Sequence, residues 1–348
     1  MKAMILKEFR QMRRDRRTVA LMVGMPVLLL TIFGYAARFD VTEIRTAALG
    51  PGAELVEGML DDAFEVVVTD SSGDSDMARE LLADSEAAVA IVAGPEPVVY
   101  VDGTELFIAQ SAMRRATSLP DNTQVEVLFN PELSTSAVMV PSLIGLILLF
   151  IGTVITSLGV VREREQGTLE QLAVTPLRPV DVIVGKIAPY FLVAVFDMVM
   201  ITIVGIYLFD VPFRGSFLMF AAFAFVYLFV VLGLGVLIST VSKSQGEAIQ
   251  LAIMVLLPQV MLSGMIFPLA SMAAGVRWIG YLLPLTYFVI GMRGVFLKAS
   301  SASALAVPLL LLTLMAVVIF ALAILRFRRD LAPKHVSKAP ALVGEAAA

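Results

Sequence analysis

The sequence predicts an α-helical polytopic membrane protein. We expect six transmembrane helices with an N-terminal interfacial helix, a re-entrant element before the last span, and a small extracytoplasmic α/β domain between spans one and two. Two observations predict this fold class. Hydrophobic residues make up 58% of the 348 residues, and the mean hydropathy of +0.87 is far above that of soluble domains. Several apolar runs also reach the roughly 20 residues that span a bilayer.

Residues 1–17 are expected to form a cytoplasmic amphipathic connecting helix. The apolar residues Met1, Ile5, Phe9 and Met12 recur at helical spacing, and lysine and arginine fill many of the positions between them. The anionic lipids of the cytoplasmic leaflet attract each such cation by about 1 kcal/mol. A plain positively charged flank of the next segment is the alternative interpretation.

Residues 18–37 are predicted to form the first transmembrane helix. The basic residues in front of this apolar run make it similar to a signal peptide, and residues 34–36 offer a small-residue cleavage position. The run is about 20 residues long, however, whereas the apolar part of a signal peptide has about 7–15. We therefore expect an uncleaved span.

Residues 38–137 are expected to form the extracytoplasmic α/β domain, because short β-rich runs alternate there with helical ones. This block holds 19 acidic and 5 basic residues. Acidic residues contribute little to topology, so the basic segments that flank the block place it outside the cytoplasm. Its carboxylates are scattered over helix faces and turns, which favours a solvated surface over a catalytic site. The predicted strands are residues 65–69, 88–93, 97–101 and 124–129, and the predicted helices lie near residues 53–61, 75–82 and 104–117.

Residues 138–326 are predicted to be a five-helix membrane domain. The loops assigned to the cytoplasm carry basic residues, and the basic tail of residues 327–348 is placed on the same side. Both termini are therefore expected in the cytoplasm, with the chain crossing a prokaryotic inner or plasma membrane several times. The predicted spans are residues 136–161, 182–209, 216–240, 248–268 and 305–325.

Residues 271–298 are expected to form a re-entrant element in the outer leaflet and not a seventh span. Pro284 interrupts the segment in its middle, and Arg277 and Arg293 lie near its ends. A further crossing would also place the basic tail outside, against the positive-inside rule.

A polar island at residues 161–181 separates two apolar runs, so it must lie in water at one face of the membrane. Thr168 can cap a helix with Gln171 as its capping-box partner, and Pro176 ends the helix. Leu169 and Leu172 give this helix an apolar stripe on an otherwise charged surface. The pattern suits docking to a soluble partner, and a simple solvated connector is the alternative.

The exact residue sequence of this island is more informative than the spacing of its apolar residues. Residues 162–179 resemble the cytoplasmic loop of ABC type-2 permeases, the membrane halves of ABC exporters such as multidrug and daunorubicin-type efflux systems. In that family the run R-E-[RK]-E-x-G-T-L-E-Q-L-x-V-T-P-L-R-P forms the coupling helix, which contacts the ATPase. The resemblance implies a coupling loop at residues 162–181. Its implied ATPase-coupling residues are Arg162, Glu163, Glu165, Gly167, Thr168, Leu169, Glu170, Gln171, Leu172, Thr175 and Pro176.

Two further runs are similar to the outer gate region of the same family. They are L-S-G-M-I-F-P at residues 262–268 and Y-L-L-P-L-T-Y-F at residues 281–288. The resemblance covers roughly residues 1–330, and within the acidic block only F-N-P-E-L at residues 129–133 matches closely. The implied gate residues are Leu262, Ser263, Gly264, Phe267 and Pro268.

Two polar residues inside predicted spans mark a candidate substrate path. Asp197 lies near the centre of its span, where a carboxylate costs about 2.5–3.5 kcal/mol on insertion scales, so it should face protein or a water-filled path. The family more often has glutamine there, so no family role transfers to this position. Gln259 is a weaker signal, because polar residues also serve helix packing in lipid. A structural hydrogen bond is the alternative for both residues.

The sequence argues against an enzyme. It contains no cysteine, and its one histidine, His335, lies in the polar tail, so metal chemistry is not expected. H-E-x-x-H, the serine elbow G-x-S-x-G and the phosphate loop G-x-x-x-x-G-K-[ST] are all absent. No cofactor is therefore expected in this chain, and ATP and Mg are expected on a partner ATPase.

The first functional hypothesis is the permease subunit of an ATP-driven ABC exporter. It would move an amphipathic drug-like or lipid-like substrate out of the cytoplasm or inner leaflet. The resemblance implies two copies of an ABC ATPase subunit and a second permease subunit, so that the permeases form a homodimer or a heterodimer. The lipid bilayer is a further expected partner, and nucleic acid is not expected to bind. A secondary transporter driven by a proton or sodium gradient, with Asp197 as coupling carboxylate, is the alternative, and a membrane-embedded enzyme finds little support.

Overall fold

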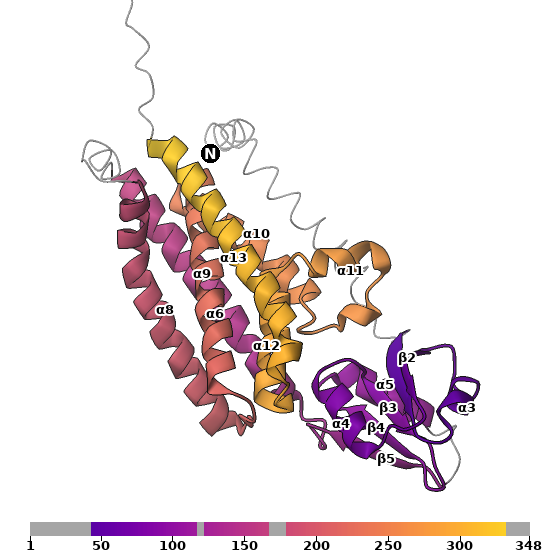
Figure 1. Ribbon diagram of the computed structural model, residues 1–348. Coiled ribbons are helices and arrows are strands. Elements are labelled where there is room, and N and C mark those ends of the chain that lie inside the picture. Colours follow the sequence, from indigo (N-terminus) through magenta and orange to yellow (C-terminus); the bar gives the residue numbers. More distant parts are fainter. Residues whose placement is uncertain (1–42, 117–121, 167–178, 332–348) are drawn as a thin grey trace, which may run out of the picture.

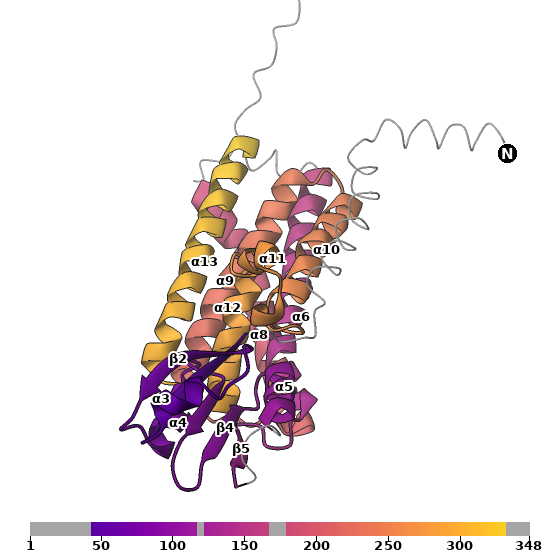
Figure 2. The same cartoon turned by 90° about the vertical axis from the view of Figure 1, so that its right-hand side faces the viewer.

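The computed structural model describes residues 43–116, 122–166 and 179–331. These residues form a body of long helices and a small sheet domain at one end of it (Figure 1). A view turned by 90° shows the same division, with the sheet domain again below the helices (Figure 2). The predicted connecting helix and first span, residues 1–17 and 18–37, lie outside the described residues.

The sheet domain contains a mixed five-stranded sheet with strand order β2-β1-β3-β4-β5. Strand β1 is parallel to β2 and β3, β3 and β4 are antiparallel, and β4 and β5 are parallel. The strands are β1 (Ile44–Leu49), β2 (Phe64–Asp70), β3 (Val89–Val92), β4 (Val98–Asp102) and β5 (Gln124–Leu128), and the helices are α3 (Ala53–Glu57), α4 (Ser75–Ala83) and α5 (Leu106–Ala116).

Helices cover both faces of this sheet. Helix α4 packs Leu82 into one apolar cluster with Leu49 and Tyr100, and α5 packs Ile108 into a second cluster with Ile44. Two separate cores therefore hold the sheet between helical layers.

The four predicted strands are confirmed within one residue of their expected bounds at each end, and the three predicted helices are confirmed as well. Strand β1 was not predicted. Five of its six residues are buried, so its sequence, I-R-T-A-A-L, lacks the alternation that marks a half-buried strand. Helix α3 is shorter than expected because Gly58 follows it directly.

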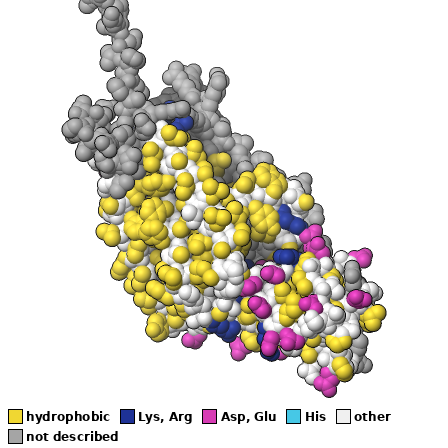
Figure 3. Space-filling model, in the orientation of Figure 1, with side chains coloured by type: hydrophobic (Ala, Val, Ile, Leu, Met, Phe, Trp, Pro, Cys, Tyr) yellow, Lys and Arg dark blue, Asp and Glu magenta, His cyan; other side chains and the backbone are white. Residues whose placement is uncertain are grey.

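Within the described ranges, five long apolar helices form the helical body, and each is long and apolar enough to cross a membrane. Helix α9 lies at the centre, with 61% of its most apolar window buried, and it packs against α6 and α13. Hydrophobic side chains dominate the visible face of this body, while acidic side chains gather on the sheet domain (Figure 3). The five are α6 (Thr135–Glu165), α8 (Pro179–Phe209), α9 (Phe217–Val241), α10 (Gln245–Leu262) and α13 (Ala302–Leu331).

The helices differ from the predicted spans at their ends. Helix α6 continues to Glu165, four residues into the predicted coupling loop, and α13 continues to Leu331, beyond the predicted span. Charged side chains do not end a helix, so a span predicted from apolarity alone is too short. Helix α10 stops at Leu262, six residues before its predicted end, because Gly264 takes a left-handed backbone angle (φ +82°).

The predicted interruption in residues 271–298 is confirmed as a bent helix pair. Helix α11 (Ala274–Gly280) and the stretch formed by α12 (Pro284–Arg293) and the π-helical turn η2 (Gly294–Lys298) meet at an angle of 78°. Pro284 occupies the first turn of α12, where its missing N–H has no intrahelical role. A short 3₁₀ turn, η1 (Leu269–Ser271), precedes the pair.

Gly145 is one of the glycines that allow close packing between α6, α9 and α12. A Cβ atom on Gly145 would lie 2.4 Å from the ring of Phe288. That ring stacks on Tyr227 with centroids 4.1 Å apart, and the Tyr227 hydroxyl donates a hydrogen bond of 3.0 Å to the Gly145 carbonyl. Without a side chain at Gly145, three helices can approach closely, as small residues allow in membranes.

Replacing Gly145 with alanine should destabilise the protein by about 1–3 kcal/mol, the usual cost of overpacking a core. The matched control is Gly185→Ala, because nothing lies within 4 Å of a Cβ atom at that position of α8. Thermal unfolding of the purified protein should show a lower Tm for the first variant only. Equal Tm values for both variants would contradict the packing described.

Candidate functional site

The end of α6 is bound to the turn between α9 and α10. Arg164 Nη1 donates hydrogen bonds of 2.9 Å to the carbonyls of Ser239 and Ser242, at the C-terminal end of α9. Glu165 accepts hydrogen bonds from Gln245, at 3.1 Å from the backbone N–H and 2.6 Å from the side-chain amide. A cation thus meets a helix C-terminus and an anion meets a helix N-terminus, the favourable pairing with each helix dipole.

We call these contacts of Arg164 and Glu165 with residues 239–245 the helix-end clamp. It places the first residues of the predicted coupling loop next to the α9–α10 turn. Of the predicted coupling residues, Arg162 and Glu165 are exposed and Glu163 is half-buried at the end of α6. The remaining ones lie outside the described residues, namely Gly167, Thr168, Leu169, Glu170, Gln171, Leu172, Thr175 and Pro176.

Gln259 is buried and joins two helices. Its side-chain oxygen accepts a hydrogen bond of 3.3 Å from the backbone N–H of Leu285, in the first turn of α12. The amide therefore satisfies one of the backbone donors that a helix N-terminus leaves unpaired. The Gln259 side chain therefore links α10 to α12.

Asp197 is half-buried on α8. Within the described part of the chain its carboxylate forms no hydrogen bond or ion pair. Helix α8 packs against α6, α9 and α13, whereas α10 packs against α6, α9, α11 and α12. The structure therefore does not bring Asp197 and Gln259 into one site.

The predicted gate residues fill the connection between α10 and α11. Leu262 and Phe267 are buried in one apolar cluster with Met272, and Ser263 is buried beside them. Gly264 and Pro268 shape the backbone of this connection, and Arg293 of α12 donates a hydrogen bond of 3.0 Å to the Met265 carbonyl. Residues 262–268 thus form a packed, irregular segment, and Arg293 of the bent helix pair is hydrogen-bonded to it.

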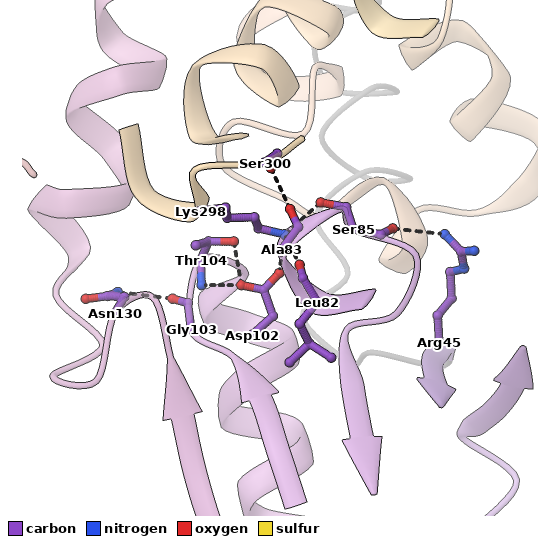
Figure 4. Close-up of polar contacts among 10 residues, drawn as sticks. All are labelled: Arg45, Leu82, Ala83, Ser85, Asp102, Gly103, Thr104, Asn130, Lys298 and Ser300. Atoms are coloured by element: carbon purple, nitrogen blue, oxygen red, sulfur yellow. Dashed lines mark hydrogen bonds and ion pairs between the residues drawn. The ribbon is translucent and has the colours of Figure 1, made fainter. Parts of the chain in front are cut away.

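The sheet domain is attached to the helical body by a buried ion pair (Figure 4). Lys298, at the end of η2, lies 2.5 Å from Asp102 at the end of β4, and both side chains are at most 5% exposed. Lys298 also donates to the Leu82 carbonyl at 3.2 Å and to Ser85 Oγ at 2.7 Å. Thr104 donates two further hydrogen bonds to Asp102. Such extra hydrogen bonds offset the desolvation cost of a buried ion pair.

Neighbouring residues extend this attachment. The backbone N–H and the hydroxyl of Ser301 donate to the Asp84 carboxylate at 2.8 and 2.7 Å. Farther along, Arg277 of α11 forms an ion pair of 2.8 Å with Glu43. The two ends of the bent helix pair therefore both contact the sheet domain.

Sequence reasoning did not single out Lys298, Asp102 or Arg164 for these roles. Lys298 ends an apolar run and Asp102 ends an apolar strand, so each is a lone charge at the edge of buried structure. The sequence does not indicate that these two residues form a pair, because they are 196 positions apart in the chain. Arg164 has a local signal, a basic residue in the last turn of a helix.

No group of three or more His, Cys, Asp or Glu side chains that could hold a metal ion occurs among the described residues. The membrane-length helices, the bent pair and the sheet domain at one end define a multi-pass helical membrane protein.

Comparison with known proteins identifies its family. A family model described as ABC-2 family transporter protein matches residues 16–325. The chain is 29% identical over 365 aligned residues to the probable multidrug ABC transporter permease YbhS of Escherichia coli (strain K12), which covers 95% of this chain and 97% of the relative. It is 28% identical to YbhR, a probable multidrug ABC transporter permease of the same strain, over 86% of this chain and 90% of the relative. The inner membrane transport permease YhhJ of that strain is 31% identical over 51% of this chain and 48% of the relative.

The chain belongs to the ABC-2 family of transporter proteins. It is the permease subunit of an ABC transporter, and ATP is hydrolysed by a separate ATPase. The resemblance found in residues 162–179 is thereby confirmed, and the gradient-driven carrier is not supported.

Replacing Lys298 with methionine should destabilise the protein by about 3–5 kcal/mol, because Asp102 would remain buried without its cation. Lys243→Met, an exposed lysine in the α9–α10 turn, is the control and should have little effect. Adding Asp102→Leu to Lys298→Met should recover much of the loss in thermal unfolding. If Lys298→Met unfolds at the same temperature as the control, the ion pair does not hold the two parts together.

Proposed function

We propose that this chain is the membrane subunit of an exporter that moves an amphipathic drug-like or lipid-like substrate out of the cytoplasm or the inner leaflet. Two copies of an ATPase subunit drive it through the coupling loop of residues 162–181. The names of the two relatives that match most of the chain, both probable multidrug permeases, support this substrate class.

The helix-end clamp is the observation that carries this proposal. A loop that receives force from an ATPase must contact more than the two helices that it connects. Without such contacts the loop would move by itself and the other helices would not follow. Arg164 and Glu165 fix the first residues of the loop to the ends of α9 and α10. Movement of the loop therefore displaces α6, α9 and α10 together, as a rigid-body transition requires.

The charge distribution supports a cytoplasmic position for this end of the bundle. Arg162, Lys243 and Arg326 lie at the ends of α6, α9 and α13 that point away from the sheet domain (Figure 1). The positive-inside rule places such cations in the cytoplasm, so the sheet domain is extracytoplasmic. Together with residues 18–37 the five long helices make six spans.

The contacts of the bent helix pair support its assignment as a re-entrant element. Arg277 near its start binds Glu43, and Lys298 at its end binds Asp102. Both partners belong to the sheet domain, so the segment enters and leaves on the same side of the membrane. Residues 262–268, which precede it, are in position to act as the outer gate.

A second permease subunit would complete the transporter, either as a copy of this chain or as a related chain. One strain of Escherichia coli holds two permeases that both match most of this chain, and this supports a heterodimer. Asp197, half-buried on α8 without a partner among the described residues, remains a candidate for the substrate path in that assembly.

Replacing Arg164 with alanine should uncouple ATP hydrolysis from transport. The reason is that the loop would then move without α9, and coupling energies of about 1–3 kcal/mol imply a loss of transport of roughly 5–150-fold. The measurement is substrate uptake into inside-out vesicles that hold the complete transporter, together with its ATPase rate. The matched control is Arg326→Ala, an exposed arginine at the same end of the bundle.

Leu169→Asp with Leu172→Asp should also uncouple ATP hydrolysis from transport and leave membrane insertion intact, because it changes only the apolar docking stripe of the loop. Full transport by the Arg164 variant at an unchanged ATPase rate would contradict the role of the clamp. Full transport by the double leucine variant would contradict docking at this loop.

A further inference from the structure

Helix α11 and the turn after it carry an exposed stripe without a charged side chain. The stripe consists of Ala274, Gly275, Trp278, Tyr281 and Leu282, which are all exposed. Their spacing of i, i+1, i+4, i+7 and i+8 places them on one helical face. Trp278 is 58% exposed and Leu282 is 61% exposed. A helix at the surface of a soluble domain presents polar side chains on its outer face, so this stripe does not suit water.

The only charged residue of α11 faces the protein instead. Arg277 forms an ion pair of 2.8 Å with Glu43 of the sheet domain and donates a hydrogen bond of 2.9 Å to the Ala270 carbonyl. Val276 and Ile279 pack against the apolar cluster that holds Leu262 and Phe267 of the predicted gate. The charge of α11 is thus inside and its apolar stripe outside, which is the pattern of a surface that contacts a membrane.

The place of α11 in the fold agrees with such a contact. The helix lies beside the long helices and above the sheet domain in both views (Figure 1 and Figure 2). It meets the stretch of α12 and η2 at 78°, and α12 packs against α6, α9 and α13. Helix α11 therefore lies at the level where the apolar body gives way to the acidic domain, and not along the spans.

The aromatic residues of the stripe favour the boundary between lipid and water. Tryptophan and tyrosine are enriched at this boundary, because each has an apolar ring and one polar group. The indole N–H of Trp278 donates to the Gly275 carbonyl at 2.9 Å, so this ring needs no hydrogen bond from water. The exposed part of the ring can then contact lipid without leaving a polar group unpaired.

The size of the stripe favours lipid over a second protein chain. Stable protein–protein interfaces bury about 800 Å² on each partner. The stripe lies within residues 274–282, on a helix of seven residues, and its centre is one tryptophan. Lipid chains need no matching surface, so a small apolar edge is sufficient to contact them.

We propose that Trp278, Tyr281 and Leu282 insert into the lipid leaflet on the side of the sheet domain, at the boundary between headgroups and acyl chains. This contact fixes the depth of the bent helix pair in the bilayer. The proposal rests on the proposed function only where this leaflet is identified as the outer one.

The stripe is next to the predicted gate. Tyr281 lines a cavity of about 380 Å³ between the sheet domain and the helical body, and Ser263, Gly264 and Pro268 of the gate line the same cavity. Lipid at the stripe therefore lies beside the cavity. In an exporter it would be the lipid nearest to a substrate that passes the gate.

The test uses the fluorescence of Trp278, the only tryptophan in the chain. The full chain is placed in nanodiscs of phosphatidylcholine whose acyl chains carry bromine either near the headgroup or near the chain end, because bromine quenches tryptophan on contact. Trp278 should lose most of its fluorescence with the shallow bromine and clearly less with the deep bromine. Iodide in the water, which quenches tryptophan exposed to water, should have little effect.

Three control positions calibrate this result, each with a tryptophan placed in a chain that carries Trp278→Phe. Leu282→Trp, on the same stripe, should reproduce the response of Trp278. Met59→Trp, at a position of the sheet domain that is 66% exposed, should be quenched by iodide and by neither lipid. Leu314→Trp, at a position of α13 that is 58% exposed, should respond most to the deep bromine.

Three results for Trp278 would overturn the proposal. Strong quenching by iodide would place the stripe in water, quenching by neither agent would show that protein covers it, and strongest quenching by the deep bromine would place it inside the hydrocarbon. The measurement needs neither ATP nor the ATPase subunit. Its failure would leave the export function standing, and a failure of ATP-driven transport would leave the fluorescence result intact.

Discussion

The structure depends on one constraint, that the backbone polar groups left unpaired at helix ends need hydrogen-bond partners. Here side chains from other elements supply many of these partners. Arg164 binds the last carbonyls of α9, Glu165 binds the first N–H of α10, and Gln259 binds the first turn of α12. Each such contact also ties two helices together. The groups that complete the backbone hydrogen bonding are therefore the groups that fix how the helices can move.

The same logic holds at the opposite end of the bundle, where the sheet domain is attached. Lys298 is buried against Asp102 and two further acceptors, and Arg277 reaches Glu43. Because both contacts come from the bent helix pair, the sheet domain and that pair form one unit next to the predicted gate. Movement of the gate residues would therefore displace the sheet domain as well. Both parts line the cavity that lies between them.

Much of the fold could be predicted from the sequence, because apolar runs of membrane length and alternating short strands carry strong local signals. The five later spans, four of the strands and the interruption at Pro284 are examples. Strand β1 was missed because its burial on both faces removes the alternation that identifies a strand. The ion pair of Lys298 with Asp102 was beyond prediction, since a single sequence shows which charges are isolated but not which of them meet. The protein family could be recognised from the residue sequence at 162–179. The hydrogen bonds from Arg164 to α9 could not, because they depend on three-dimensional packing.

The most direct test of this account is the distance between spin labels on cysteines placed at Gln166 and Lys243, two exposed positions on either side of the helix-end clamp. The chain has no natural cysteine to interfere. In the complete transporter the account predicts one distance distribution with and without ATP, because the loop and the α9–α10 turn move together, and a broader distribution in Arg164→Ala. A distance that changes with ATP while Arg164 and Glu165 are intact would contradict it.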